Sequence, residues 1–475
     1  MSLAAVATAG LGFLQTIVLS RLLRPEDFGL SSMVWVVLGM VDAYADMGMT
    51  QALIVRQDAT KEQLSSVYWT IAAGGTVSAA AIVALTPALV WFYRQPAIVP
   101  LIPIVAASFW LACLGKPFQV ILQRNLRFDT LSKAEIASSV SGLVVSVIAA
   151  SRGLGAFSLV FGSLAAAFSK SALIASWSWR EWHPNWHFRL ADISGYLRFG
   201  AFRMGEATSN YISANVDYLA VGRFAGAEAL GIYRLAYELV VRPLSTINPI
   251  LNTVALPLFA RKQSDDDALR RGYLELVRLI ATLAFPLLAG LAVTASVAIP
   301  LIFGKKWVSA IPLVQVLCLM GMCKTISNPV GSLLLAKGRV DIGFYSNLIL
   351  AVINTIVFWI AAQISVLAVA YSWVVIVVLF QAASWKSFYY TTIRLSITMY
   401  LRALAYPVGF TVFMSLTVTA TLAILLPRVQ DQRIVLALAV AEGAVTYVAL
   451  HLFFDRAYFR ALLTQIFHNP FQDAR

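Results

Sequence analysis

The segment Ser20–Gly29, SRLLRPEDFG, decides the fold, because a degenerate copy of it returns as Gly222–Gly231, GRFAGAEALG. Arginine, glutamate and glycine stand at identical spacing in the two copies, so Arg21 corresponds to Arg223 and Gly29 to Gly231. Each copy follows one long apolar run and precedes another. Matching connectors of this kind predict that the chain is built from two similar halves.

A second set of matches extends the repeat through both halves. Pro100, Leu101, Pro117, Arg127 and Asp129 return at a constant offset as Pro312, Leu313, Pro329, Arg339 and Asp341. The matches fall on equivalent connectors of the first six and the next six apolar runs. Because six spans is an even number, both copies enter the membrane in the same orientation, related by a pseudo-two-fold axis along its normal. A duplication kept only for stability is the alternative.

The composition indicates that lipid is the solvent. Of 475 residues, 60% are hydrophobic and 12% are charged, and the mean hydropathy of +0.78 lies far outside the range of soluble domains. A helix needs about 20 mostly apolar residues to cross a bilayer. Fourteen spans are predicted, at residues 2–20, 30–48, 67–91, 98–122, 132–151, 153–176, 196–221, 230–257, 277–302, 309–335, 342–362, 365–385, 400–426 and 434–454.

The expected fold is therefore an all-α polytopic membrane protein, with two six-helix lobes and two additional C-terminal helices. The N-terminal lobe is predicted at residues 1–177 and a cytoplasmic connector at 178–195. The C-terminal lobe is predicted at 196–390, and the last two helices with a cytoplasmic tail at 391–475. The net charge is +13, but no stretch is left to form the basic soluble face that nucleic-acid binding requires.

Basic residues orient the spans. With the N-terminus in the cytoplasm, the connectors on that side hold more than twice as many lysines and arginines as the opposite side, and cytoplasmic loops carry such an excess. Both termini are therefore predicted to be cytoplasmic. The first apolar run lacks the basic start of a signal peptide and is expected to stay in the protein. Whether the natural start lies upstream of Met1 stays open.

Ionisable side chains within the spans mark the candidate site, because each is costly unless it meets a partner or a water-filled cavity. Guanidinium groups suit a compact phosphate anion. Residues predicted to bind such a substrate are Arg203 and Asn210 in the seventh span, Arg234 and Arg242 in the eighth, and the repeat-related Arg21 and Arg223 near a periplasmic exit. Carboxylates predicted to balance these charges or to take up a coupling cation are Asp42, Asp46, Glu206, Asp217 and Glu238.

Helical spacing supports this set. Arg203, Glu206, Asn210 and Asp217 share one face of the seventh span, and Arg234, Glu238 and Arg242 follow one another at intervals of four in the eighth. A structural ion-pair ladder between helices is the alternative for both groups. Lys116 and Lys324, near the cytoplasmic ends of equivalent spans, are interpreted as side chains that snorkel to the interface.

Other chemistry finds no support in the sequence. His183 and His187 have helical spacing, but Pro184 interrupts the helix that would align them as metal ligands. With the tryptophans around them they are predicted to form an interfacial aromatic belt. No metal site and no cofactor are expected. The motifs Gly-x-x-x-x-Gly-Lys-Ser/Thr, Cys-x-x-Cys and Gly-x-Ser-x-Gly are absent from the sequence, so transport driven by ATP binding to this chain is not expected.

Two further stretches resemble a known family. Residues Pro300–Cys318, PLIFGKKWVSAIPLVQVLC, and Asn328–Phe344, NPVGSLLLAKGRVDIGF, look like the corresponding stretches of the colanic acid exporter group. That group belongs to the polysaccharide transporter (Wzx) branch of the multidrug/oligosaccharidyl-lipid/polysaccharide exporter superfamily. The similarity extends from the first span to about residue 390 and fades in the last two helices.

The resemblance implies a flippase of the bacterial inner membrane. Such a protein carries an undecaprenyl-pyrophosphate-linked repeat unit from the cytoplasmic to the periplasmic leaflet by alternating access of two lobes. The expected partners are this lipid-linked oligosaccharide, membrane lipids, and a polysaccharide polymerase with its co-polymerase. Coupling to a proton or sodium gradient stays open. The alternatives are a membrane-embedded polymerase or ligase, which the short extracytoplasmic loops disfavour, and a multidrug antiporter of the same superfamily, which an arginine-lined cavity disfavours.

Overall fold

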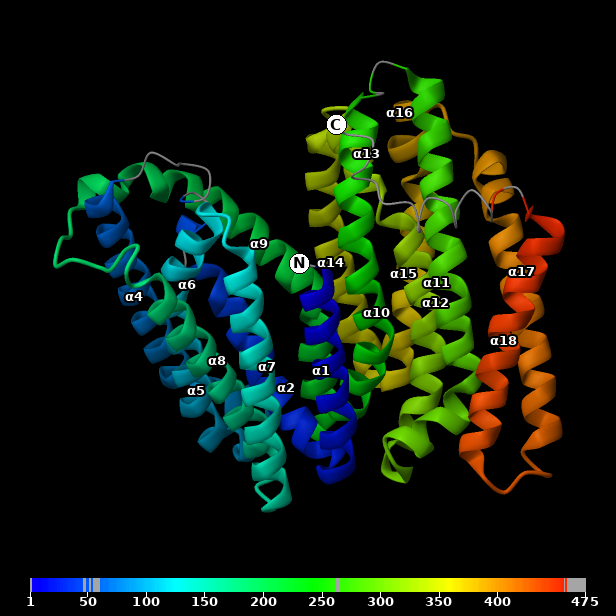
Figure 1. Ribbon diagram of the computed structural model, residues 1–475, viewed down its shortest axis with the longest axis horizontal. Helices are drawn as coiled ribbons and strands as arrows, with labels where there is room; N and C mark the ends of the chain where they lie inside the picture. Colours follow the sequence, from blue (N-terminus) through cyan, green and yellow to red (C-terminus); the bar gives the residue numbers. More distant parts are fainter. Residues whose placement is uncertain are drawn as a thin grey trace. The chain divides into compact units, whose positions relative to one another are not determined.

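A computed structural model describes residues 2–45, 48–50, 53, 60–261, 263, 265–456 and 458. Figure 1 shows a chain made of long helices, and no strand occurs in the described ranges. Eleven helices of this described part are long and apolar enough to cross a membrane, judged by length and composition. The all-α polytopic fold predicted from the sequence is confirmed. Each predicted span overlaps a helix, but the span at 67–91 covers Lys61–Ala84 and Thr86–Tyr93, and the span at 309–335 covers Ile311–Ser327 and Val330–Ala336.

The chain forms two compact units. Unit 1 comprises residues 1–235 and 345–372, and unit 2 comprises residues 236–344 and 373–475. Unit 1 contains α1 (Ser2–Leu22), α2 (Pro25–Ala45), α4 (Lys61–Ala84), α5 (Thr86–Tyr93), η1 (Pro96–Leu101), α6 (Ile102–Arg124), α7 (Phe128–Ser151), α8 (Ala156–Ser178) and α9 (Leu190–Phe224). Unit 2 contains α11 (Asp266–Ile302), η2 (Lys305–Ala310), α12 (Ile311–Ser327), α13 (Val330–Ala336), η3 (Lys386–Tyr390), α16 (Thr391–Ile393), α17 (Ile397–Leu425) and α18 (Gln432–Phe454).

Three helices contribute residues to both units, namely α10 (Gly226–Arg261), α14 (Val340–Ile364) and α15 (Val366–Ala383). The units are defined by packing, whereas the lobes predicted at 1–177 and 196–390 are defined by the internal repeat. The predicted lobe boundaries therefore stay a prediction.

Polar caps and prolines explain where the helices begin and break. Thr60 forms a capping box with Gln63 at the start of α4, and the Asp265 side chain accepts from two backbone N–H groups at the start of α11. Such caps satisfy donors that lack a partner within the helix. Proline interrupts two of the predicted spans: Pro87 separates α5 from α4, and Pro329 separates α13 from α12, because proline has no N–H to continue the ladder.

Small residues let α7 and α8 pack closely within unit 1. A side chain on Gly162 would collide with the Ser146 hydroxyl at 1.7 Å, and one on Gly142 would meet the Gly162 carbonyl oxygen at 3.1 Å. The hydroxyls of Ser141 and Ser169 bond across the same interface at 2.6 Å. Close approach through small residues is how helices associate where lipid removes the hydrophobic driving force.

The starts of α2 and α10 cross in direct backbone contact, also within unit 1. A Cβ placed on Gly29 would lie 1.7 Å from the Ala227 carbonyl oxygen, and one on Gly231 would lie 1.8 Å from the Pro25 carbonyl oxygen. In the repeat, Gly29 corresponds to Gly231 and Pro25 to Ala227. The two contacts are therefore reciprocal, as a two-fold relation between the copies requires. The segments found by self-comparison are thus brought together face to face.

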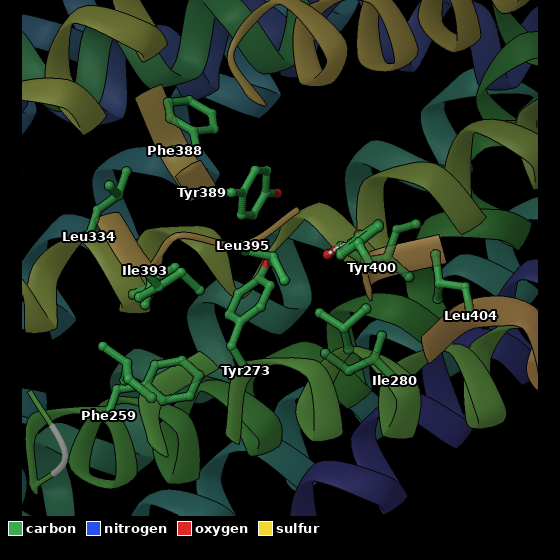
Figure 2. Close-up of a cluster of buried hydrophobic side chains, with 14 of the residues drawn as sticks. Phe259, Tyr273, Ile280, Leu334, Phe388, Tyr389, Ile393, Leu395, Tyr400 and Leu404 are labelled. Atoms are coloured by element: carbon green, nitrogen blue, oxygen red, sulfur yellow. Dashed lines mark hydrogen bonds between the residues drawn. The ribbon is translucent and has the colours of Figure 1, made fainter. Parts of the chain in front are cut away.

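One hydrophobic cluster of unit 2 contains three tyrosines. Figure 2 shows Tyr273 of α11, Tyr389 of η3 and Tyr400 of α17 converging from different segments. The ring centroids of Tyr273 and Tyr389 are 5.7 Å apart, and those of Tyr389 and Tyr400 are 6.0 Å apart. The Tyr400 hydroxyl accepts from the Gln381 amide at 3.3 Å. The last helix pair is joined to the unit through this packing, because α17 contributes Tyr400.

The connector before α9 docks on the start of α4. The backbone N–H of Asn185 donates to the Ser65 hydroxyl at 3.1 Å, and the Trp69 indole N–H donates to the Asn185 carbonyl at 2.8 Å. Trp186, which is 94% exposed, stacks on Trp69 at 4.9 Å between ring centroids. The aromatic cluster predicted here therefore packs against the end of a span.

A carboxylate completes this docked connector. The Ser66 hydroxyl donates to Asp192 Oδ2 at 2.8 Å, and His187 Nε2 lies 3.1 Å from the same oxygen. The pKa of the Asp192 carboxyl is held below its ordinary value, chiefly by the hydrogen bond from Ser66. The hydrogen bond and the charge of His187 lower it further. The connector is thus held at its end by a carboxylate that stays ionised in mild acid.

Candidate functional site

One face of α2 carries the polar residues of the candidate site. Ser32, Trp35, Gly39 and Asp42 follow at i, i+3, i+7 and i+10, which confines them to an arc of about 80° on a helix that turns about 100° per residue. Three other helices of unit 1 place side chains on this face. We call it the α2 face, and it consists of these four residues.

Arg234 of α10 occupies the first position on the α2 face. Its Nη1 donates to the Ser32 hydroxyl at 2.9 Å, and its Cζ lies 4.4 Å from the centroid of the Trp35 ring. A guanidinium over an indole ring gains a cation–π attraction. The backbone crossing explains the contact, because Gly29 and Gly231 lie one turn before Ser32 and Arg234.

This hydrogen bond also locates the pseudo-two-fold axis. Ser32 and Arg234 are 202 positions apart, the same offset that relates Arg21 to Arg223, so they are equivalent residues of the two copies. Equivalent residues that touch each other lie close to the axis that relates them. Arg234 therefore places a permanent positive charge at the symmetry axis of the repeat.

Tyr211 of α9 covers the middle of the α2 face. Its hydroxyl donates to the Val36 carbonyl at 2.8 Å. The ring lies over Gly39, where an added Cβ would meet ring atoms at 2.6 Å. Only glycine leaves room for the ring at this point of α2.

Lys116 of α6 meets the far end of the α2 face. Its Nζ lies 2.6 Å from Asp42 Oδ1, and the two side chains are 24% and 50% exposed. Asp42 is thus in an ion pair between two spans, and its predicted role in balancing the arginine charges or taking up a coupling cation stays a prediction. Sequence reasoning interpreted Lys116 as a snorkelling side chain and missed this partner, although a lysine inside an apolar run beside Pro117 was the available signal.

The seventh-span residues have different surroundings. Asp217 is fully buried, accepts from the Tyr233 hydroxyl at 2.7 Å and bonds the backbone N–H of Tyr218 at 2.9 Å. Asn210 is exposed, so these two members of the predicted stripe lie in unlike environments. The side chains of Arg203 and Glu206 and the whole of Asp46 lie outside the described residues. Their predicted roles stay predictions.

The repeat-related arginines end equivalent helices. Arg21 is in the last turn of α1 and Arg223 in the last turn of α9, each four residues before the reciprocal contact of Pro25 and Ala227. The two arginines therefore lie at the same end of unit 1. The Arg223 guanidinium is 6.0 Å from the rings of Phe92 and Phe224.

In unit 2, the remaining predicted residues form a pair. Arg242 Nη2 lies 3.2 Å from Glu238 Oε2, and the side chains are 42% and 22% exposed. Both side chains belong to α10, so this is an i, i+4 pair within one helix, and the alternative of an ion-pair ladder between helices stays a prediction. Lys324 also has a neighbour within the unit, since its Nζ lies 4.9 Å from the centroid of the Trp373 ring.

Known proteins resemble the chain in sequence. Residues 18–312 match the family described as "Polysaccharide biosynthesis protein". The chain is 35% identical to the teichuronic acid biosynthesis protein TuaB of Bacillus subtilis, over 85% of this chain and 84% of that protein. It is 32% identical to the lipopolysaccharide biosynthesis protein WzxC of Escherichia coli, over 73% of this chain and 70% of that protein. The family resemblance noted in the sequence is confirmed.

Solved structures share the fold. The lipid II flippase MurJ, in an inward closed conformation, matches with a TM-score of 0.78 at 15% identity, over 97% of this chain and 99% of MurJ. An inward-facing multidrug resistance transporter of the MATE family, from the MOP superfamily, matches with a TM-score of 0.59 at 15% identity, over 85% of this chain and 95% of the transporter. The fold is therefore that of the MOP superfamily, and the chain is a multi-pass membrane protein.

Proposed function

Because this chain belongs to the family of polysaccharide biosynthesis proteins, we propose that it is a flippase for an undecaprenyl-pyrophosphate-linked oligosaccharide. It moves the repeat unit from the cytoplasmic to the periplasmic leaflet by alternating access, for exopolysaccharide or lipopolysaccharide synthesis. What supports the proposal most directly is Arg234, a guanidinium at the axis of the repeat that donates to the Ser32 hydroxyl and lies over the Trp35 ring. A pyrophosphate offers the acceptor oxygens that such a group binds.

The same proposal specifies the membrane, the topology and the partners of the protein. We expect it in the bacterial inner membrane with both termini cytoplasmic, acting on a substrate that a polymerase and co-polymerase use next. It performs no covalent chemistry on the substrate. Coupling to a proton or sodium gradient is part of the proposal, with Asp42, Asp46, Glu206, Asp217 and Glu238 as the carboxylates to be tested for it.

Arg234 provides the experiment. In cells that depend on this chain for polymer export, Arg234→Ala should block export while the amount of protein in the membrane stays normal. A charge-assisted hydrogen bond contributes about 1.5–3 kcal/mol, so its loss weakens substrate binding roughly ten- to a hundredfold. Arg234→Lys keeps the charge but loses the bidentate fork, so it should restore export only in part. Arg203→Ala tests the predicted seventh-span partner in the same assay.

A matched variant separates binding from stability. Arg242→Ala removes one partner of the Glu238 pair, and a structural ladder predicts a lower protein level that Arg242→Ala with Glu238→Ala restores. Arg270→Ala, which removes a pair with Asp267 in unit 2, serves as the control and should leave export unchanged. Normal export by both Arg203→Ala and Arg234→Ala would end the anion-site argument.

A further inference from the structure

We propose that α11 bends at Pro286 during transport and that the hydrogen bond from Tyr447 of α18 to the Thr282 carbonyl is the latch that controls this bend. While the latch is closed, α11 keeps its present course. When it opens, the section of α11 beyond Pro286 moves into the cavity beside it. This inference rests on the proposed function and adds to it a hinge for alternating access.

Pro286 leaves α11 with one backbone hydrogen bond missing. Proline has no N–H, so the carbonyl of Thr282, four residues earlier, loses its usual donor within the helix. The Tyr447 hydroxyl donates to this carbonyl instead, at 3.1 Å. Thr282 and Tyr447 are buried, with 3% and 7% of their surfaces exposed. One side chain of α18 therefore completes the hydrogen-bond ladder of α11 at a site protected from water.

One side of α11 is weakened at four successive turns. Residues at intervals of four share this side, namely Thr282, Pro286, Gly290 and Thr294. The threonine hydroxyls donate back to the carbonyls four positions earlier, at 2.8 Å for Thr282 and 2.6 Å for Thr294. Back-bonds of this kind often bend helices, as proline does, and glycine adds backbone freedom. This side of α11 is therefore the side on which the helix bends most easily.

A cavity of about 650 Å³ lies along the weakened side, and α17 and α18 form its other walls. All four residues of the weakened side line it, together with Met414 of α17 and Gly443 and Tyr447 of α18. A Cβ added to Gly290 would meet no atom of the described residues within 4 Å. Helices normally pack without spaces of this size between them. The section of α11 beyond Pro286 therefore has room to move toward α17 and α18.

On the other side of Pro286, α11 is fixed to α18. Arg278 forms an ion pair with Asp455 at the end of α18, one turn before the carbonyl that Tyr447 holds. The section before Pro286 is thus attached at two successive turns, whereas the section beyond it borders the cavity. Hinges lie at such points, where a few residues absorb the change in backbone angles between two sections.

Two substitutions of opposite effect test the latch. Hydrogen–deuterium exchange of the purified full chain in detergent, read by mass spectrometry on peptides from residues 282–294, measures how often this section opens. Tyr447→Phe removes a donor from a buried carbonyl, so exchange should become about tenfold faster. Pro286→Ala restores the backbone N–H and should slow exchange. When Pro286→Ala is present, Tyr447→Phe should have little further effect, because the helix then supplies its own donor.

Tyr400→Phe is the matched control. The Tyr400 hydroxyl also donates to a buried carbonyl of unit 2, that of Ile326, at 3.4 Å. Its loss should leave exchange of the α11 peptides unchanged, and Pro286→Ala should not compensate for it. Unchanged exchange in Tyr447→Phe would overturn the latch. A tenfold effect of Tyr447→Phe that persists together with Pro286→Ala would overturn it as well.

Polymer export tests whether the bend serves transport. In the assay designed for Arg234, Pro286→Ala should lower export severalfold at a normal protein level, because it stiffens α11. Gly290→Leu fills the cavity without removing the latch and should also lower export. Gly409→Leu in α17 is its control: an added Cβ there meets no atom of the described residues within 4 Å, but Gly409 lies outside the cavity lining. Normal export by Pro286→Ala would overturn the hinge.

The failure of this inference is distinguishable from the failure of the proposed function. If Arg234→Ala blocks export while Pro286→Ala exports like the wild type, the hinge is wrong and the function stands. If cells that lack this chain still export polymer, the proposed function fails and the role of the bend in transport fails with it. Exchange is measured without substrate, so it decides the latch in either case. Gel-filtration profiles identify any variant that does not fold, and Pro286→Ala alone decides the export question if Gly290→Leu is among them.

Discussion

The crossing of α2 and α10 makes a quantitative prediction about two glycines. Replacing Gly231 with alanine places a methyl group 1.8 Å from the Pro25 carbonyl oxygen. Real Cβ atoms essentially never approach closer than 3.0 Å, so the two backbones must separate by about 1.2 Å. Overpacking of this kind costs about 1–3 kcal/mol. Alanine returns about 0.5–1 kcal/mol, because it is a better helix former than glycine. The difference between these terms is a destabilisation of up to about 2.5 kcal/mol.

The same separation reaches Arg234. Its bond to Ser32 lies one turn away and measures 2.9 Å, so a shift of about 1.2 Å lengthens it beyond hydrogen-bond reach unless the side chain adjusts. Gly231→Ala should therefore lower both stability and transport. Gly29→Ala should do the same, because the contact is reciprocal.

Thermal unfolding in detergent, followed by intrinsic fluorescence, measures the predicted loss of stability. A loss of 1 kcal/mol lowers Tm by about 2–4 °C in units of this size. Gly10→Ala in α1 is the control, since no atom lies within 4 Å of the added Cβ, and its Tm should stay level or rise. The double variant Gly29→Ala with Gly231→Ala should lose less than the sum of the single losses, because the first methyl group has already parted the helices. Equal Tm values for Gly231→Ala and Gly10→Ala, or additive losses in the double variant, would refute the crossing.

Three other predictions follow from separate contacts. Tyr233→Phe removes a donor from the fully buried Asp217 and should cost about 1–3 kcal/mol in unfolding free energy; an unchanged Tm would contradict the contact. The Ser66 and His187 bonds lower the pKa of Asp192, so the connector should stay docked at about pH 5. It should be released only when the pH falls through the lowered pKa of Asp192, which lies below the ordinary value of about 3.9. Ser66→Ala should move that loss to higher pH, as read from the fluorescence of the stacked Trp69 and Trp186. A reporter active only in the periplasm should be silent when fused after Gln472, and strong activity would overturn the predicted topology.

Most of the fold follows from the sequence because lipid imposes a simple rule. A span must be long, apolar and helical, so the apolar runs coincide with helices from α1 to α18. The positions at which helices are interrupted were harder to predict from the sequence. Pro87 and Pro329 interrupt helices, whereas Pro286 and Pro407 lie inside α11 and α17, and the sequence does not distinguish a proline whose freed carbonyl finds another partner from one that ends a helix.

The candidate site shows what periodicity omits. The sequence identified Arg234 and Asp42 as residues that need partners, because each is a charged side chain within an apolar span. Spacing did not identify the partners themselves: Ser32 lies 202 positions from Arg234, and Lys116 lies 74 positions from Asp42. Those pairings depend on how helices cross, and the crossing depends on two glycines that carry no charge and attract no attention in a search for polar residues.

The reciprocal contact of Pro25 with Gly231 and of Gly29 with Ala227 also constrains how this family evolves. After a duplication, the two copies normally accumulate changes independently. At this crossing they cannot, because a larger residue in either copy pushes against the main chain of the other. Among homologues, the positions equivalent to 29 and 231 should therefore remain small together or change together. Differences in function between relatives therefore have to arise elsewhere, on the side chains that surround this pair of glycines.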